Sequence, residues 1–175
     1  MNTELEQKLS NTVLGETRGD IVLEDREAFQ LATLWLFRKT QHVLRIFSYD
    51  LESDLLDRPE VFEAVSKTAR DGRNSSVHIL VQNSTFASNH GHALVRLAQK
   101  IPSHVQIRAT HKDYRHFSHS YTLADETTVM FRKNPESYIG TINFNDPFHA
   151  RELHEKFDEI WDMSEPDAST RQLSI

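Results

Sequence analysis

Short runs of consecutive apolar residues alternate with segments of helical periodicity along residues 21–108. Buried strands of a parallel sheet have this appearance, because helices cover both of their faces. Apolar side chains spaced three and four positions apart predict the helices that connect such strands. The pattern predicts a short edge strand at Ile21–Leu23 and buried strands at Val43–Phe47, His78–Val81 and His104–Arg108.

Three helices are expected between these strands, and a further one near the end of the chain. Asp25 can cap a helix that runs to about Thr40, because its side chain can accept hydrogen bonds from the first free N–H groups. Ser53 or Asp57 can cap the next helix, whose Pro59 falls in the first turn, where a missing N–H is tolerated. The remaining helices are expected at about Asn89–Lys100 and Pro147–Asp162.

After residue 108 the pattern changes, and three strand candidates follow one another without a helix. Early alternation of strands and helices predicts a parallel sheet with crossover helices, and the later hairpin-like strands make the sheet mixed. We therefore expect an α/β fold with a mixed, mainly parallel sheet flanked by helices. The three late strands are expected at Phe117–Ala124, Thr127–Arg132 and Tyr138–Asn143, with a loop at Lys133–Ser137.

The length of 175 residues fits one domain with a single core. We expect a polar N-terminal arm at residues 1–20, the domain at residues 21–164 and a C-terminal tail at residues 165–175. No stretch approaches about 18 consecutive apolar residues, and the first residues lack the basic and apolar regions of a secretory signal. These features predict a soluble cytoplasmic protein with no membrane partner.

Charge and composition narrow the classes of function. A net charge of −6 argues against broad nucleic-acid binding, which needs Lys and Arg to displace phosphate counterions. The chain has no Cys, which excludes disulfides and thiolate chemistry. Its histidine pairs lie two, three or five positions apart, and none has the four-residue spacing of a helical zinc pair. We expect neither a metal nor a cofactor.

One constellation in the C-terminal third carries candidate chemistry. His119-Ser120-Tyr121 is followed by Asp125 and then by Gly140-Thr141-Ile142-Asn143. This arrangement resembles the phospholipase D signature, His-x-Lys-x4-Asp followed by Gly-Ser/Thr-x-Asn. The resemblance implies a phospholipase D-like fold. Further phrases resemble an uncharacterised bacterial branch of that class: Ser48-Tyr49-Asp50-Leu51, Ile79-Leu80-Val81-Gln82-Asn83, Gly91-His92, Asn134-Pro135-Glu136-Ser137-Tyr138 and Trp161-Asp162-Met163-Ser164-Glu165-Pro166-Asp167.

In active enzymes of this class two such halves meet, so the resemblance implies a homodimer that completes its site at a two-fold axis. One His attacks phosphorus and the other protonates the leaving group, while Lys and Asn hold the phosphoryl oxygens and Asp orients its His. The resemblance places His119 at the nucleophile position, Asp125 at the acidic position and Asn143 at the amide position. Tyr121 then occupies the Lys position, and Thr141 becomes a candidate phosphate contact.

Three departures from the signature bear on activity. Tyr121 can donate a hydrogen bond but brings no positive charge, which weakens stabilisation of a phosphoryl oxyanion. The spacing from His119 to Asp125 is one residue short, and the segment from Asp125 to Gly140 is longer than usual. We therefore expect a diverged, non-catalytic domain that acts as a binding or regulatory module. The alternative is a metal-independent homodimeric phosphodiesterase or nuclease that uses His119 from each chain.

Other residues could contribute to a ligand site. Arg108 or Arg115, with His116, could supply the missing positive charge as a phosphate clamp, or could belong to a solvated loop. Asp50 follows a buried strand, where open α/β sheets place ligands, although it could also cap a turn. Some relatives of the bacterial branch occur beside acetyltransferase domains, which implies an acyltransferase-type protein partner.

Overall fold

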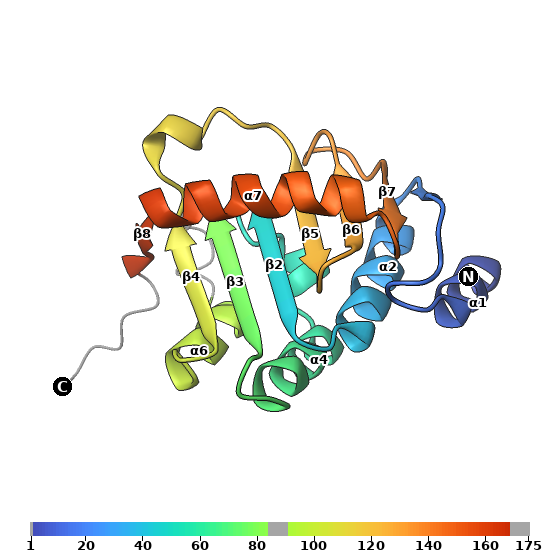
Figure 1. The fold of residues 1–175 in the computed structure, drawn as a ribbon, viewed down its shortest axis with the longest axis horizontal. Helices are drawn as coiled ribbons and strands as arrows, with labels where there is room; N and C mark the ends of the chain where they lie inside the picture. Colours follow the sequence, from blue (N-terminus) through green and yellow to red (C-terminus); the bar gives the residue numbers. More distant parts are fainter. Residues whose placement is uncertain (1, 84–90, 169–175) are drawn as a thin grey trace.

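A single eight-stranded sheet organises the protein, with helices on both of its faces (Figure 1). The computed structural model describes residues 2–83 and 91–168. The strand order is β1-β7-β6-β5-β2-β3-β4-β8. The helices are α1 (Thr3–Asn11), α2 (Arg26–Lys39), α3 (Ser53–Leu56), α4 (Pro59–Arg70), α6 (Ala93–Lys100) and α7 (Pro147–Met163), with a 3-10 turn at Lys112–Tyr114. The strands are β1 (Ile21–Leu23), β2 (Val43–Ser48), β3 (Ser76–Val81), β4 (Val105–Ala109), β5 (Ser120–Ala124), β6 (Thr128–Arg132), β7 (Gly140–Asn143) and β8 (Glu165–Pro166).

The mixed character expected of the sheet is confirmed, although in the described part of the chain antiparallel strand pairs outnumber parallel ones by five to two. Strands β2, β3 and β4 are parallel, and β5, β6, β7 and β1 continue the sheet as antiparallel neighbours. The parallel strands point their C-terminal ends to the same edge, from which the long connection between β4 and β5 also rises (Figure 1). Loops that follow β2, β3 and β4 therefore gather at this edge.

A layer of buried side chains lies on each face of the sheet, between the strands and the helices that cover them. On one face, α2, α4 and α6 pack against residues such as Leu44, Ile46 and Ile79. On the other face, α7 crosses the strands alone and buries Phe157 and Trp161 against a smaller aromatic cluster (Figure 1). Because neighbouring residues of a strand point to opposite faces, β2 and β3 contribute alternately to both layers. Their near-continuous apolar runs follow from this double burial.

Helix boundaries agree with the sequence pattern in part. Asp25 caps α2 as expected, with its carboxylate accepting a hydrogen bond from the Ala28 N–H at 2.8 Å. The expectation that Asp57 or Ser53 caps the helix containing Pro59 is wrong. Arg58 occupies that position without a side-chain cap, and Ser53 begins the separate short helix α3. The Asp57 carboxylate instead accepts a hydrogen bond from the backbone of Ala93, at the start of α6.

Two late strands begin after the positions where they were expected. The strand expected from Phe117 begins at Ser120, and the strand expected from Tyr138 begins at Gly140, because the preceding residues leave the hydrogen-bonded ladder. The helix expected from Asn89 begins at Ala93, because Gly91 has a φ of 64° and His92 is the N-cap of α6; residues 84–90 lie outside the described part.

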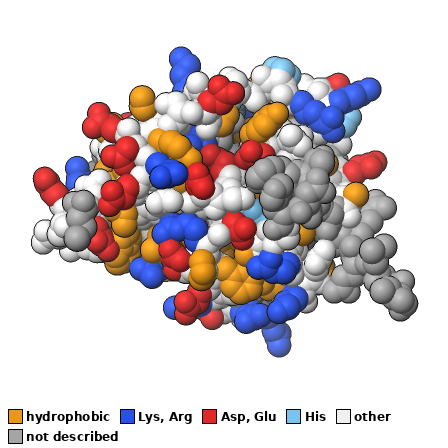
Figure 2. All heavy atoms as spheres, turned by 180° about the vertical axis from the view of Figure 1, so that it is seen from behind, with side chains coloured by type: hydrophobic (Ala, Val, Ile, Leu, Met, Phe, Trp, Pro, Cys, Tyr) orange, Lys and Arg blue, Asp and Glu red, His pale blue; other side chains and the backbone are white. Residues whose placement is uncertain are grey.

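The ends of the described chain also pack on the domain. Helix α1 forms within residues 1–20, and its Leu9 is fully buried in the main core. At the other end, β8 pairs with the outer edge of β4. None of the helices formed by residues 2–83 and 91–168 has both the length and the apolar character that crossing a bilayer requires. Acidic and basic side chains are intermixed over the face seen from behind (Figure 2).

Candidate functional site

The imidazole of His119 lies in an aromatic cluster at the start of β5. Its ring centroid is 5.7 Å from that of Phe47, 5.2 Å from Phe117, 5.7 Å from Tyr121 and 5.6 Å from Phe131. Within residues 2–83 and 91–168 the imidazole forms neither a hydrogen bond nor an ion pair. Burial lowers the pKa of His119, which favours the neutral ring. His119 is half-buried, so its ring packs against aromatic side chains while part of it stays accessible.

Tyr121, which stands at the lysine position of the signature, belongs to the same cluster. Its ring stacks on Phe47 at 5.2 Å and is 3% exposed. The hydroxyl has no hydrogen-bond partner among the described residues, and burial raises the pKa of Tyr121 well above its usual range. The phenol therefore stays neutral and contributes no charge at this position.

Asp125 lies at the opposite end of β5 from His119. The rise of about 3.3 Å per strand residue puts roughly 20 Å between the two Cα atoms. The Asp125 carboxylate accepts hydrogen bonds from the backbone N–H groups of Gln41 at 3.0 Å, His42 at 2.8 Å and Val43 at 2.9 Å. Within one chain, the structure does not bring Asp125 to His119. Asp125 instead holds the segment that enters β2.

The Gly-Thr-x-Asn part of the signature forms β7. Thr141 lies directly opposite Phe131 of the neighbouring strand β6, so its side chain points to the same face of the sheet as the aromatic cluster. Asn143 lies two residues further along the strand, and its side-chain amide donates to Asp20 at 3.0 Å. Its carbonyl oxygen accepts from the backbone N–H of Asn145 at 3.0 Å. The Asn143 side chain thus ties the turn before α7 to the segment before β1.

The two arginines considered as phosphate clamps make other contacts. The guanidinium of Arg108 donates to the Trp161 carbonyl at 2.7 Å and lies 4.3 Å from the centroid of the Trp161 ring. Arg115 donates from Nε to the Thr110 carbonyl at 3.0 Å. Neither cation is paired with His119, although Arg115 and His116 line a cleft close by. The compensating clamp is therefore not assembled in this structure.

The largest of the cavities described for this protein, about 840 Å³, lies at the C-terminal ends of β2 and β3. We call it the strand-end cleft. Its volume falls in the range of small-molecule sites, and its position is where open α/β sheets bind ligands. Four connections contribute to it, those after β2, after β3, between β4 and β5, and between β6 and β7. Its lining residues are Tyr49, Asp50, Glu52, Ser53, Asp54, Gln82, Arg115, His116, Phe117, Ser118, Asn134, Pro135, Glu136 and Tyr138.

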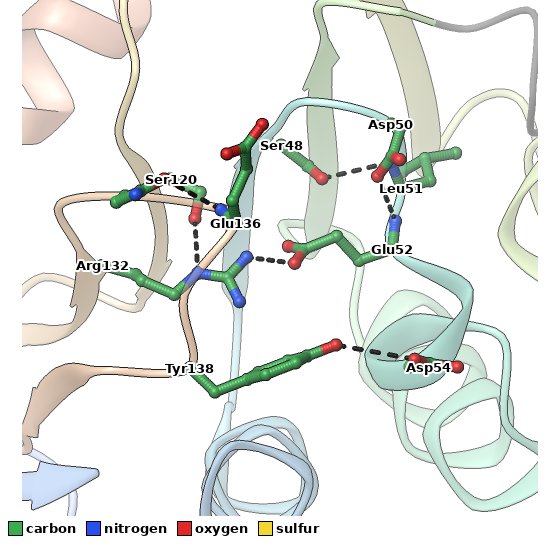
Figure 3. A network of polar contacts seen from close by, with 10 residues as sticks. Ser48, Asp50, Leu51, Glu52, Asp54, Ser120, Arg132, Glu136 and Tyr138 are labelled. Atoms are coloured by element: carbon green, nitrogen blue, oxygen red, sulfur yellow. Dashed lines mark hydrogen bonds and ion pairs between the residues drawn. The ribbon is translucent and has the colours of Figure 1, made fainter. Parts of the chain in front are cut away.

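Glu52, one of the residues that line the strand-end cleft, belongs to a buried ion pair (Figure 3). The Arg132 guanidinium pairs with the Glu52 carboxylate and also donates from Nε to the Ser120 hydroxyl at 3.3 Å. Arg132 is 2% exposed, and its guanidinium lies beside the contacting rings of Phe29 and Tyr138, at 5.3 and 5.4 Å from their centroids. Burial raises the pKa of Glu52, while the Arg132 charge opposes this shift. Arg132 thereby anchors the loop after β2.

The loop after β2 also has unusual backbone angles. Leu51 and Glu52 have φ values of 65° and 25°, a region that non-glycine residues rarely adopt. The Ser48 hydroxyl accepts from the Leu51 N–H, and the Asp50 carboxylate accepts from the Glu52 N–H (Figure 3). This turn directs Asp50, Glu52 and the following residues into the cleft. Of the expected site residues, the cleft unites Asp50, Arg115 and His116.

Sequence reasoning missed Glu52, Arg132 and Tyr138. The available signal was three carboxylates at alternate positions, Asp50, Glu52 and Asp54, directly after a buried strand. Arg132 carried no such signal, because an arginine at a strand end is usually exposed. Among the described residues, no three His, Asp or Glu side chains converge closely enough to hold a metal ion.

The sequence was compared with protein-family models and with curated proteins. A family model described as "Domain of unknown function (DUF7931)" matches residues 25–173. No curated protein is significantly similar in sequence.

Several solved structures are similar to this protein in fold. Nuc, a phospholipase D family member from Salmonella typhimurium, has a TM-score of 0.60 and 14% identity, covering 85% of this chain and 97% of its own. NucT from Helicobacter pylori has a TM-score of 0.58 and 8% identity, covering 85% and 99%. TrmBL2, an archaeal chromatin protein whose structure shows a novel mode of DNA binding, has a TM-score of 0.64 and 18% identity over 94% of this chain. This chain spans 59% of TrmBL2. At these identities the likeness establishes a phospholipase D-like fold alone.

Proposed function

The chain belongs to the family described as Domain of unknown function (DUF7931), and we propose that it is a non-catalytic phospholipase D-like domain that acts as a binding or regulatory module. The surroundings of His119 carry this proposal. A histidine that attacks phosphorus needs a lone pair directed at the phosphate and donors that stabilise the developing charge. The half-buried ring of His119 instead packs against four aromatic rings, which provide neither a general base nor a cation.

The rest of the signature supports the same conclusion. Tyr121 is buried and neutral where a lysine would bear a charge. Loss of one oxyanion donor costs about 10²–10³ in kcat in enzymes of other classes, and a dimer would lack two such donors. Asp125 and Asn143 are engaged in backbone and side-chain contacts away from His119. Each signature residue therefore has a structural explanation that requires no reaction.

The second candidate is a homodimeric phosphodiesterase, favoured by the likeness of the fold to Nuc, a phospholipase D family member. Nuc and NucT are each matched over nearly their whole length, so each consists of one such unit. A homodimer of this chain would be supported by exposed apolar side chains near the start of α7, on β1 and just before β7. These are Val22, Ile139 and Phe148, which are 61%, 63% and 75% exposed.

A phosphodiesterase assay separates the two candidates. Purified wild-type protein, His119→Ala and His42→Ala are incubated with bis(p-nitrophenyl) phosphate and a chelator. We expect no release of p-nitrophenol above buffer from any of the three. His42 is a suitable control because it is an exposed histidine that belongs neither to the signature nor to the lining of the cleft. Release by wild type and His42→Ala that is absent in His119→Ala would establish the phosphodiesterase instead.

A further inference from the structure

We propose that the strand-end cleft binds an aliphatic polyamine or a similar small organic cation with several ammonium groups. This inference rests on the proposed function as a binding module and assigns a class of ligand to it. The cleft is distinct from the aromatic cluster that contains His119, although Phe117 contributes to both.

The charge of the lining favours a cation. Asp50, Glu52, Asp54 and Glu136 line the cleft, against Arg115 as the only Lys or Arg among its described lining residues. Arg132 neutralises Glu52 from behind and Arg26 pairs with Asp54 at 3.6 Å, which leaves the carboxylates of Asp50 and Glu136 facing one arginine. Within the described part of the chain, Asp50 and Glu136 form no ion pair. A phosphodiester would meet repulsion in such a site, whereas an ammonium group would gain charge-assisted hydrogen bonds.

The aromatic residues of the cleft fit the same class of ligand. Tyr49 follows β2 and is 49% exposed, and Tyr138 stands between β6 and β7. The faces of aromatic rings attract cations, and their edges pack well against methylene groups. Burial is the main cause of the raised pKa of Tyr138, and the negative charges of Asp54 and Glu52 raise this pKa further. These two charges make the potential around Tyr138 more negative. Methylene segments between ammonium groups would lie against these rings.

The spacing of the carboxylates argues for an extended cation over a metal ion. The described side chains contain no group of three His, Asp or Glu that could converge on one metal. Asp50 and Asp54 come from the loop after β2, and Glu136 comes from the connection between β6 and β7. Charges distributed across a cavity of about 840 Å³ match a chain-like molecule with separated charges better than a single point charge.

Isothermal titration calorimetry with spermidine tests the proposal on the full chain. The test variant is Asp50→Asn with Glu136→Gln, which removes two charges and keeps the acceptor that Asp50 offers to the Glu52 N–H. The matched control is Glu152→Gln with Glu155→Gln, which removes two charges from the exposed side of α7, away from the cleft. Glu136→Gln alone is an exposed change and serves if the double variant unfolds.

We expect saturable spermidine binding that the control variant preserves and the test variant weakens about tenfold or more, since charge-assisted contacts dominate such sites. Glu136→Gln alone should weaken it by a smaller factor. Fully acetylated spermidine and inorganic phosphate should not bind. Absence of saturable binding, or equal weakening by the test and control pairs, would overturn the polyamine assignment. Either result leaves the phosphodiesterase assay unaffected, so failure of this inference is distinguishable from failure of the proposed function.

Discussion

The carboxylate of Asp125 accepts hydrogen bonds from three consecutive backbone N–H groups, and its own N–H donates to the Val43 carbonyl at 2.8 Å. Asp125 has a φ of 50°, at the turn that joins β5 to β6. Aspartate tolerates this conformation better than most residues do. The same residue therefore forms the hairpin turn and fixes the chain entering β2. The phospholipase D signature gives the acidic residue at this position a catalytic role. In this protein, the hydrogen bonds of Asp125 to the backbone explain the residue fully.

Asp125→Ala should lower the free energy of unfolding by about 1–3 kcal/mol, because two exposed N–H groups and one half-buried N–H group lose a charged acceptor. Asp125→Asn should cost less, since its single carbonyl oxygen can still accept from His42 and Val43. Urea denaturation followed by circular dichroism measures both changes. Glu126→Ala, at an exposed neighbouring position, is the control and should alter stability little. Equal stability of wild type and Asp125→Ala would contradict the anchoring role.

Among the elements, β7 shows most clearly why part of the signature persists. A Cβ added at Gly140 would collide with the Phe131 carbonyl oxygen and approach Cζ of Phe29 at 2.8 Å. The glycine of the Gly-Thr-x-Asn segment is therefore required by close packing between β6, β7 and α2. Ile142, the intervening residue, is fully buried in the main core. The close packing of Gly140 and Ile142, together with the side-chain hydrogen bonds of Asn143, explains the sequence of this strand.

Gly140→Ala should destabilise the protein by about 3 kcal/mol or more, because backbone atoms would have to move to admit the methyl group. Gly72→Ala provides a matched control, since the nearest atom to its added Cβ is the Ser75 hydroxyl at 3.2 Å, in a turn. Thermal unfolding of the two variants should show a large loss of Tm for Gly140→Ala and a small change for Gly72→Ala. Similar losses would refute the packing explanation of Gly140.

The elements could be predicted from the sequence more completely than the site. Buried strands such as Val43–Ser48 show as apolar runs, and Asp25 marks the start of α2, because both signals are local. The pair of Glu52 and Arg132 joins residues 80 positions apart, and no local pattern links them. The packing of His119 likewise depends on strands that meet only in the folded sheet. Long-range contacts of this kind set the chemistry of the site.

Across the whole molecule, folding holds several histidines in neutral form. Burial lowers the pKa of His78, His92, His119 and His154. The largest effect is at His78, whose ring stacks on Trp161 at 4.3 Å. Burial, together with the nearby Arg45 and Arg108 charges, lowers the pKa of His78 to about 4. The unfolded chain therefore binds more protons than the folded protein between about pH 6.5 and pH 4.

Stability should consequently be greatest above about pH 6.5 and should fall as the pH falls towards 4. The lowered pKa of His78 should account for about 1–2 kcal/mol of this loss, because the ring is half-buried and solvent screens part of the effect. The variant His78→Gln should therefore show a smaller difference in unfolding free energy between pH 7 and pH 4 than wild type. His42→Gln, at an exposed position, controls for removal of an imidazole. Parallel pH profiles for wild type and His78→Gln would exclude the effect.

Helix α7 is the single helix that crosses the aromatic face of the sheet, and it is also the last helix in the described chain (Figure 1). A nascent chain can complete β1 to β7 before residues 147–163 leave the ribosome. During that interval Phe47, Leu80, Tyr121 and Leu123 have no cover. Exposed aromatic and aliphatic surface of this kind attracts chaperones and promotes aggregation. Truncation before Pro147 should therefore yield inclusion bodies, and the interval between the synthesis of β7 and that of α7 is the one in which the folding chain is most prone to aggregate.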